Sequence, residues 1–217
     1  MACNCPLPTA LTAIDATVCP EELGQIQRVW FVRAGNVQWD TVDPTATGKT
    51  LPATIQPNLP TVSAGWTTLK AAADDTKVVF APLFGGDITI TPGDAITQGG
   101  NDNSTLNGQT YFVAFPDSTF SARFDQLTKN QTSQLKELIC ENLEVYFINE
   151  DGDIIGQRDP SDADLFKGIP VTNVALQSRN VQGFATRDSN ILTFQLDADW
   201  DTYFEKQTPT DFNALTF

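Results

Sequence analysis

Short apolar segments separated by turn-forming residues constrain the fold of this chain more than any other feature. Runs of roughly four to eight residues, rich in Val, Ile, Phe and Thr, recur along the sequence, with Gly, Pro, Asn or Asp between them. Segments of this length are typical of strands, because helices usually need more residues. The runs that we interpret as strands are 26–32, 66–69, 77–80, 87–91, 111–115, 119–124, 143–148, 154–157, 169–176, 183–186 and 191–196.

Turn residues between neighbouring runs predict hairpins. Asp151-Gly152 lies between the runs 143–148 and 154–157, and Asp-Gly between apolar strands is a strong hairpin signal. Pro116-Asp117-Ser118 separates the runs on either side of it in the same way. We therefore expect the strand before Pro116 to pair with the strand after it.

One segment has helical periodicity. Thr128 and Gln131 have the spacing of a capping box, in which each side chain bonds the backbone N–H of the other residue. The apolar residues of the segment share one helical face: Leu127, Leu135, Leu138 and Ile139. We expect a helix over about residues 128–140, with Cys140 as a small buried hydrophobe at its end. The predicted fold is mostly β, a β-sandwich or open β-barrel with one packed α-helix and long loops or arms.

The length of 217 residues suits one domain, and we expect a single domain over residues 1–217. Three segments lack a strand or helix pattern. The N-terminal segment 1–18 is predicted to be extended, and the segment 41–65 is a Pro-rich arm or surface loop, because proline cannot donate to a central ladder. The Gly/Asn-rich segment 92–109 is long for a structureless connection. It is either a surface loop or an arm that orders against a neighbouring subunit.

The charge balance excludes several partners. Asp and Glu number 27 against 13 Lys and Arg, so the formal net charge is −14. Duplex DNA and anionic membranes repel such a chain, and its basic residues form no run of neighbours. The sequence also contains no secretory signal and no apolar run of about 18 residues. We expect synthesis in the cytoplasm, no membrane contact and no sequence-specific binding of nucleic acid.

The chain contains no histidine. It therefore lacks the usual general base near neutral pH, the usual partner of a nucleophilic Ser or Cys, and the commonest metal ligand. Serine–histidine hydrolases, cysteine–histidine proteases and His-ligated zinc enzymes are excluded. Acids are plentiful, but no local pattern joins an acid pair to the tryptophans as glycoside hydrolysis would require. We predict that the protein is not an enzyme and has no catalytic residues.

Motifs that resemble metal or cofactor sites each depart from their pattern at a required residue. Gly48-Lys49-Thr50 has Asp43 where a phosphate loop needs its first glycine. The acidic segments 149–153 and 197–201 have calcium-loop spacing at first but lack the glycine that should follow. The cysteines lack the two closely spaced pairs of a structural zinc site: Cys3, Cys5, Cys19 and Cys140. We predict no cofactor and no metal.

Two stretches of sequence resemble a known group of proteins. The first consists of Cys19-Pro20 and the segment 24–31, and the second of the segments 124–128, 135–138 and 143–147 with Asp151-Gly152. The first resembles the openings of virion proteins from tailed phages of Bacteroidetes hosts. The second is similar to the helix-plus-hairpin region of the tail proteins of those phages.

The resemblance implies a tail tube subunit of the virion. Such a subunit is a β-sandwich flanked by a helix, and copies of it form stacked hexameric rings around a DNA-conducting channel. Its partners are its own copies and other virion proteins, and DNA passes without binding. Two other functions stay open: a capsid decoration or auxiliary head protein, and a carbohydrate-binding adhesive module. The last would need exposed aromatic residues such as Trp39 or Trp200.

Overall fold

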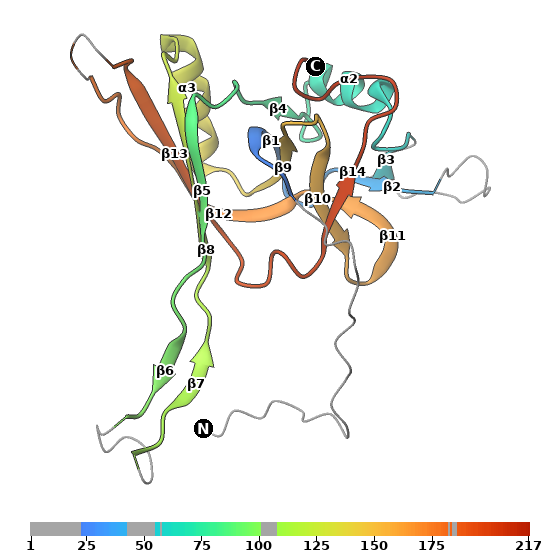
Figure 1. Cartoon of the computed structure of the whole chain (residues 1–217). Helices are drawn as coiled ribbons and strands as arrows, with labels where there is room; N and C mark the ends of the chain where they lie inside the picture. The colour runs from blue at the N-terminus through green and yellow to red at the C-terminus, as the bar shows by residue number, and fades with distance from the viewer. Residues whose placement is uncertain (1–22, 43–54, 57, 101–107, 182, 184–185) are drawn as a thin grey trace. The chain divides into compact units, whose positions relative to one another are not determined.

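The computed structural model describes residues 23–42, 55–56, 58–100, 108–181, 183 and 186–217 (Figure 1). The predicted N-terminal segment 1–18 and about half of the Pro-rich segment 41–65 lie outside these residues. The chain divides into two compact units. The larger contains residues 23–93 and 117–217, and the described part of the smaller lies within residues 94–116.

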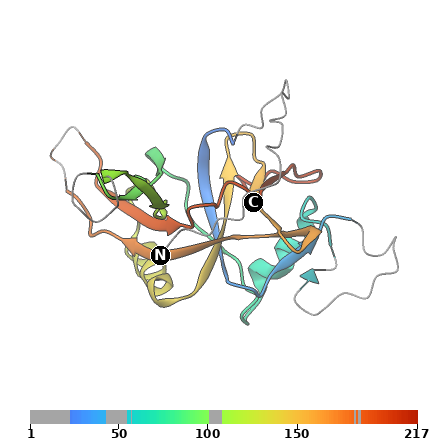
Figure 2. The same cartoon turned by 90° about the horizontal axis from the view of Figure 1, so that it is seen from below.

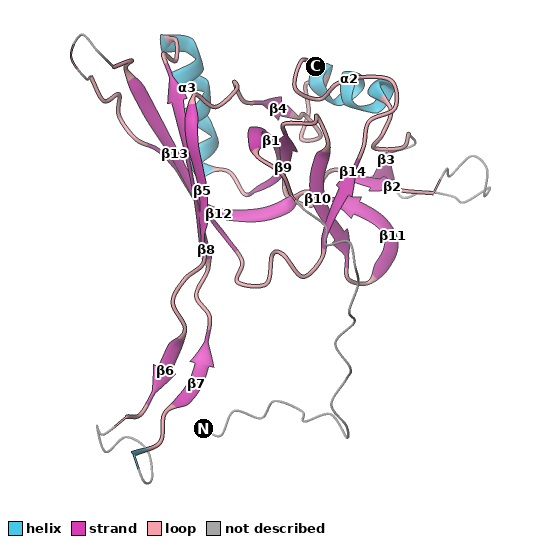
Figure 3. Ribbon diagram, in the orientation of Figure 1, coloured by secondary structure: helices cyan, strands magenta, loops and turns pink. Residues whose placement is uncertain are grey.

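Within the described residues, the larger unit is built on one sheet of 12 strands. Figure 3 colours the strands magenta. Its main path runs β3-β2-β11-β10-β9-β12-β13-β8-β5, and β1, β4 and β14 pair beside this path. The pairs are antiparallel except β2–β3, and the path has two ends and does not close into a barrel. The prediction of a mostly-β fold is thus confirmed, and the sheet is open. The strands are β1 (Ile26–Arg33), β2 (Gln38–Asp40), β3 (Ile55–Gln56), β4 (Val79–Phe80), β5 (Gly86–Thr91), β8 (Ser118–Asp125), β9 (Leu143–Asn149), β10 (Ile154–Asp159), β11 (Asp162–Lys167), β12 (Ile169–Leu176), β13 (Ser189–Leu196) and β14 (Phe204–Gln207).

The pair β1–β9 separates two hydrophobic cores. All seven residues of β9 are buried, as expected for a strand that is covered on both faces. Val145 and Phe147 face the first core cluster, with Phe120 and Phe194 among its other members. The alternate residues of β9 face the second core cluster, which contains three tryptophans: Trp30, Trp39 and Trp66.

Helix α2 (Ser63–Ala71) corrects the predicted strand at 66–69. Trp66 and Leu69 lie one helical turn apart, and both are buried. The Trp66 ring packs between neighbours in the second core cluster, with its centroid 4.9 Å from that of Trp30, and its Nε1 donates a hydrogen bond to the Pro60 carbonyl at 2.8 Å. The two threonines of this segment favour a strand locally, but burial of the indole outweighs that preference.

Helix α3 (Lys129–Glu137) confirms the predicted helix and its capping box. Gln131 N donates to Thr128 Oγ1 at 3.2 Å, and Thr128 N donates to Gln131 Oε1 at 2.9 Å. The helix continues as a 3₁₀ turn, η2 (Leu138–Cys140), and lies beside β12 (Figures 1 and 2). A 3₁₀ turn has about three residues per turn instead of about 3.6, so it rotates the following side chains off the buried face. Ile139 is accordingly 40% exposed, and Cys140 is an exposed free thiol instead of a buried one.

The hairpin of β9 and β10 is confirmed, with Ile154 paired to Ile148. The buried Asn149 holds its turn, since Asn149 Oδ1 accepts from the backbone N–H groups of Asp151 at 3.1 Å and Asp153 at 2.8 Å. Gly152 has φ of 85°, a conformation in which glycine is strongly preferred.

The second predicted hairpin is wrong. Strand β7 (Tyr111–Ala114) pairs with β6 (Ile96–Gln98), whereas β8 pairs with β13 and β5. The residues around Pro116 therefore connect strands of two different units instead of turning one strand back on the other. Of the predicted strand 183–186, residues 183 and 186 lie in a turn and a bend, and the other two residues are outside the described part.

Candidate assembly surfaces

The antiparallel hairpin of β6 and β7 exposes a concentration of apolar side chains. Half of the ten exposed large hydrophobic residues in the described chain lie within or next to this hairpin. Each of the five is between 45% and 59% exposed: Ile96, Tyr111, Phe112, Val113 and Phe115. We call these five residues the apolar hairpin surface.

Both faces of β7 contribute to the apolar hairpin surface. All four residues of β7 are exposed, so alternation does not turn its apolar residues toward a core. The rings of Phe112 and Phe115 contact each other, with centroids 4.8 Å apart. A two-stranded hairpin is marginally stable alone in water, and contiguous exposed apolar residues mark sites of protein interaction. The sequence predicted the strand at 111–115 but not this partner or this exposure.

Strand β5 ends the main path of the sheet. It pairs with β8 on one side, from Gly86 opposite Arg123 to Thr91 opposite Thr119. On its other side, no strand of the described residues adds to the path. An edge of this kind presents backbone donors and acceptors to which a strand of another chain can pair.

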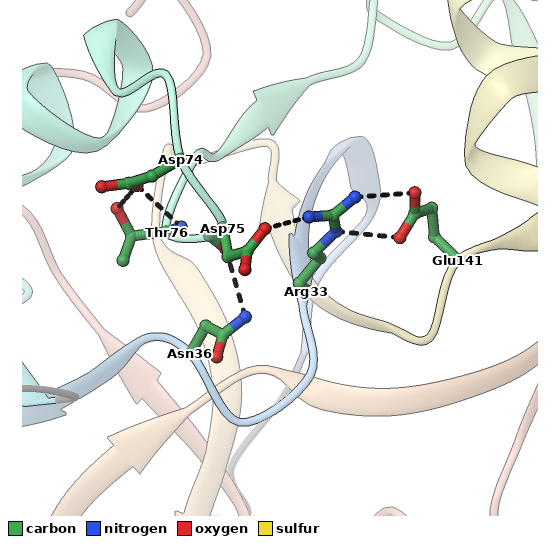
Figure 4. A network of polar contacts seen from close by, with 6 residues as sticks. All are labelled: Arg33, Asn36, Asp74, Asp75, Thr76 and Glu141. Atoms are coloured by element: carbon green, nitrogen blue, oxygen red, sulfur yellow. Dashed lines mark hydrogen bonds and ion pairs between the residues drawn. The ribbon is translucent and has the colours of Figure 1, made fainter.

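A polar network surrounds Arg33 at the end of β1 (Figure 4). Arg33 donates to both carboxylate oxygens of Glu141, each at 2.8 Å, and also contacts Asp75. The hydrogen bonds and charge of Glu141, with the charge of Asp75, raise the pKa of Arg33 above its ordinary value. In return, the hydrogen bond from Arg33 lowers the pKa of Glu141.

This network lines a groove of about 720 Å³ together with apolar residues of β1 and η2. Its ion pairs are exposed and contribute modestly to stability. The network connects β1 to the loop at Asp75 and to the segment after α3 through Glu141. It therefore positions these two segments, because the one guanidinium group contacts a carboxylate from each.

A second groove, of about 600 Å³, is lined by cations. Lys129 and Lys136 come from α3, and Arg179 follows β12. No basic cluster was visible in the sequence, because Arg179 lies far along the chain from the two lysines, and the fold brings it to the same groove. Three hydroxyl side chains and one amide complete the lining: Thr132, Ser133, Ser178 and Asn190.

Glu144 of β9 carries a buried carboxyl group. Its Oε1 accepts a hydrogen bond from Gly35 N at 3.0 Å, and the residue is 5% exposed. Burial raises the pKa of Glu144 to about 7, and the bond from Gly35 and the nearby Lys167 only partly oppose this shift. No groove described above includes Glu144, so we assign it an effect on stability and not a role at a surface.

Several residues singled out by the sequence can now be placed. Trp39 and Trp200 are buried, so the exposed aromatic residues that a carbohydrate-binding module would need are not these two. The oxygen of Asn149 is occupied by backbone N–H groups of its own turn. The segment 48–50 and three of the four cysteines lie outside the described residues. Within the described residues, no group of three Cys, Asp or Glu side chains is arranged to hold a metal ion.

No helix in the described residues combines the length and the apolar character needed to cross a membrane.

Comparison with solved structures gives distant matches. No protein-family model and no curated protein matches the sequence. A chain in the tail of an empty gene transfer agent (GTA) particle, from a helical refinement with C6 symmetry, is 9% identical over 57% of this chain and 83% of that chain, with a TM-score of 0.32. A chain in the virion of the native GTA particle is 9% identical over 52% and 78%, with a TM-score of 0.31. TM-scores this low do not establish a common fold.

Proposed function

We propose that this protein is a non-enzymatic structural subunit of a virion, and specifically a tail tube subunit. Its copies assemble into stacked hexameric rings that enclose a channel for DNA. The observation that carries the proposal is the apolar hairpin surface, since this chain exposes five large hydrophobic side chains in one short hairpin. The resemblance of the sequence to phage tail proteins supports the same role.

Burial of the apolar hairpin surface supplies the driving force for assembly. Removing apolar area from water contributes roughly 25 cal/mol per Å², and a large aromatic residue covers on the order of 150 Å² or more. The hairpin holds three aromatic residues, Tyr111, Phe112 and Phe115, so its contact with another copy would stabilise a ring substantially. The open edge of β5 offers a second, backbone-mediated contact in which the sheet of one copy continues into the next.

The acidic character of the chain suits a channel that conducts DNA. A formal net charge of −14 repels the phosphate backbone, so DNA in the channel would not adhere to its wall. Each subunit also repels its neighbours at long range. The apolar contacts of assembly must therefore exceed this repulsion, and the size of the apolar hairpin surface is consistent with that requirement.

The proposal is tested by negative-stain microscopy of the purified protein, with light scattering over a concentration series. We expect rings or tubes of uniform diameter with a central channel. Phe112→Asp should abolish them, whereas Leu83→Asp, which changes a side chain of similar exposure in the larger unit, should leave them intact. A monomer at every concentration that binds to preformed capsids would instead identify an auxiliary head protein.

A further inference from the structure

One face of α3 carries an uncompensated positive charge. Lys129 and Lys136 lie in the positions i and i+7 of a single helical stripe, with Thr132 and Ser133 at i+3 and i+4 between them. Arg179 reaches the same groove from the end of β12 and donates to the Leu127 carbonyl. In the described residues none of these three cations forms an ion pair. Five other cations do: Arg33, Arg123, Arg158, Lys167 and Lys206.

An acidic turn follows β13 in the same unit. Asp197, Asp199 and Asp201 are all exposed, and no ion pair or side-chain hydrogen bond in the described residues involves them. The turn has a defined backbone, since Trp200 N donates to the Asp197 carbonyl at 3.2 Å and Thr202 N donates to the Asp199 carbonyl at 3.0 Å. The buried Trp200 ring fixes it to the first core cluster. Three carboxylates are thus presented to solvent on an anchored turn.

The basic groove and the acidic turn lie at opposite ends of β13. Asn190, which lines the groove, is the second residue of the strand, and Asp197 follows its last residue. At about 3.3 Å per residue the strand separates the two sites by roughly 20 Å. A single copy therefore cannot bring its own acidic turn into its own groove. A second copy that follows in the same orientation can, and such a head-to-tail contact generates closed rings or filaments.

We propose that the basic groove binds the acidic turn of a second copy of this chain. This inference rests on the proposed function and gives one ring contact its chemistry. The groove presents three positive groups, which equal the three carboxylates in number and are opposite in charge: Lys129, Lys136 and Arg179. The hydroxyl groups between the lysines can donate hydrogen bonds to the same carboxylate oxygens. The phosphates of nucleic acid carry the same charge, and the net charge of −14 repels them at long range as it repels another copy. The acidic turn differs because it is part of every copy that the apolar hairpin surface brings together. The acidic turn is supplied by assembly itself.

The contact is tested by charge reversal on each side. One variant carries Lys129→Glu and Lys136→Glu, a second carries Asp197→Lys and Asp201→Lys, and a third carries all four changes. Each of the first two should raise the protein concentration needed for assembly at least tenfold, because like charges then face each other. The third should assemble as the unchanged protein does, and a mixture of the first two should form alternating assemblies.

The controls separate this contact from folding and from net charge. Glu150→Lys with Asp151→Lys makes the same charge change as the acidic-turn variant on another exposed turn, and should not impair assembly. Lys129→Glu favours the start of α3 and Lys136→Glu disfavours its end, so their effects on helix stability roughly offset. Thermal melting should confirm that all variants fold.

The outcomes also distinguish the inference from the proposed function. If the unchanged protein never assembles, the proposed function fails. If the unchanged protein assembles and the one-sided variants assemble equally well, only the inference fails. Folded one-sided variants that the fourfold variant does not rescue would overturn the pairing of these two sites. A groove variant that assembles normally but no longer retains a short DNA duplex would reassign the groove to nucleic acid.

Discussion

At the scale of single residues, Glu144 shows the cost of placing a carboxyl group in a sheet that is covered on both faces. The hydrogen bond from Gly35 does not replace the water that a carboxylate loses on burial, so the neutral form is favoured and the pKa rises to about 7. The folded state therefore holds this proton over a pH range in which the unfolded chain has released it. The stabilising effect is complete below the ordinary pKa of glutamate and is lost as pH rises through 7.

Glu144→Gln should remove this pH dependence. From pH 4.5 to pH 8 the unchanged protein should lose free energy of unfolding relative to the variant, by up to about 3 kcal/mol for a shift of this size. Urea denaturation of the monomer at pH 5, 6, 7 and 8 measures the difference. Parallel pH profiles for the two proteins would contradict the assignment. Asp159 does not confuse the comparison, because its hydrogen bonds from Ser161 and Lys167 lower its pKa to about 2 and it titrates below this range.

At the scale of elements, the first turn of α3 depends on a reciprocal cap. Thr128→Ala removes the acceptor for Gln131 N and should lower the free energy of unfolding by about 1 kcal/mol. Thr128→Ser keeps the hydroxyl group and should retain most of that stability. Chemical denaturation of the monomers compares the three proteins. Lys129 is the first residue of the helical stripe that lines the basic groove, so Thr128→Ala should also weaken assembly. An unchanged free energy of unfolding would show that water replaces the cap hydrogen bond.

Elements with strong local signals were predictable from the sequence. The hairpin at 143–157 has an Asp-Gly turn, α3 has its capping box, and the strand at 169–176 has the predicted bounds. Elements whose structure depends on contacts with residues distant in the sequence were not predictable. Trp66 becomes helical because a helix buries its ring against Trp30, and a window of four residues carries no information about that neighbour.

The assembly surfaces show the same division between local and distant information. The run 111–115 was recognisable as a strand, but its pairing with β6 and its exposure depend on where the chain turns back. The basic groove joins the lysines of α3 to Arg179, which lies 43 positions after Lys136, and the sequence shows these cations only as isolated residues. Local patterns identify α3 and several of the longer strands, whereas the surfaces of this chain arise from tertiary contacts.

At the scale of the whole molecule, the two core clusters share their central strands. In β10, Ile154 faces the second cluster and its neighbour Ile155 faces the first, and both are fully buried. The residues of β9 alternate in the same way. Because one backbone supports both cores, loss of either core removes one covered face of the same strands. We therefore expect the larger unit to unfold in one cooperative transition.

The neighbouring isoleucines give a matched test of this cooperativity. Ile154→Val and Ile155→Val each remove one buried methylene group and should each cost about 1 kcal/mol of unfolding free energy. Three of the four tryptophans lie in the second cluster, so tryptophan fluorescence reports mainly on that core, whereas far-ultraviolet circular dichroism reports on the whole sheet. If the cores unfold together, Ile155→Val shifts the fluorescence midpoint as much as the dichroism midpoint, although its side chain faces the other core. A shift of the dichroism midpoint without a shift of the fluorescence midpoint would instead show that the two cores unfold separately. In that case β9 and β10 would stay paired with each other while the second core cluster remains folded.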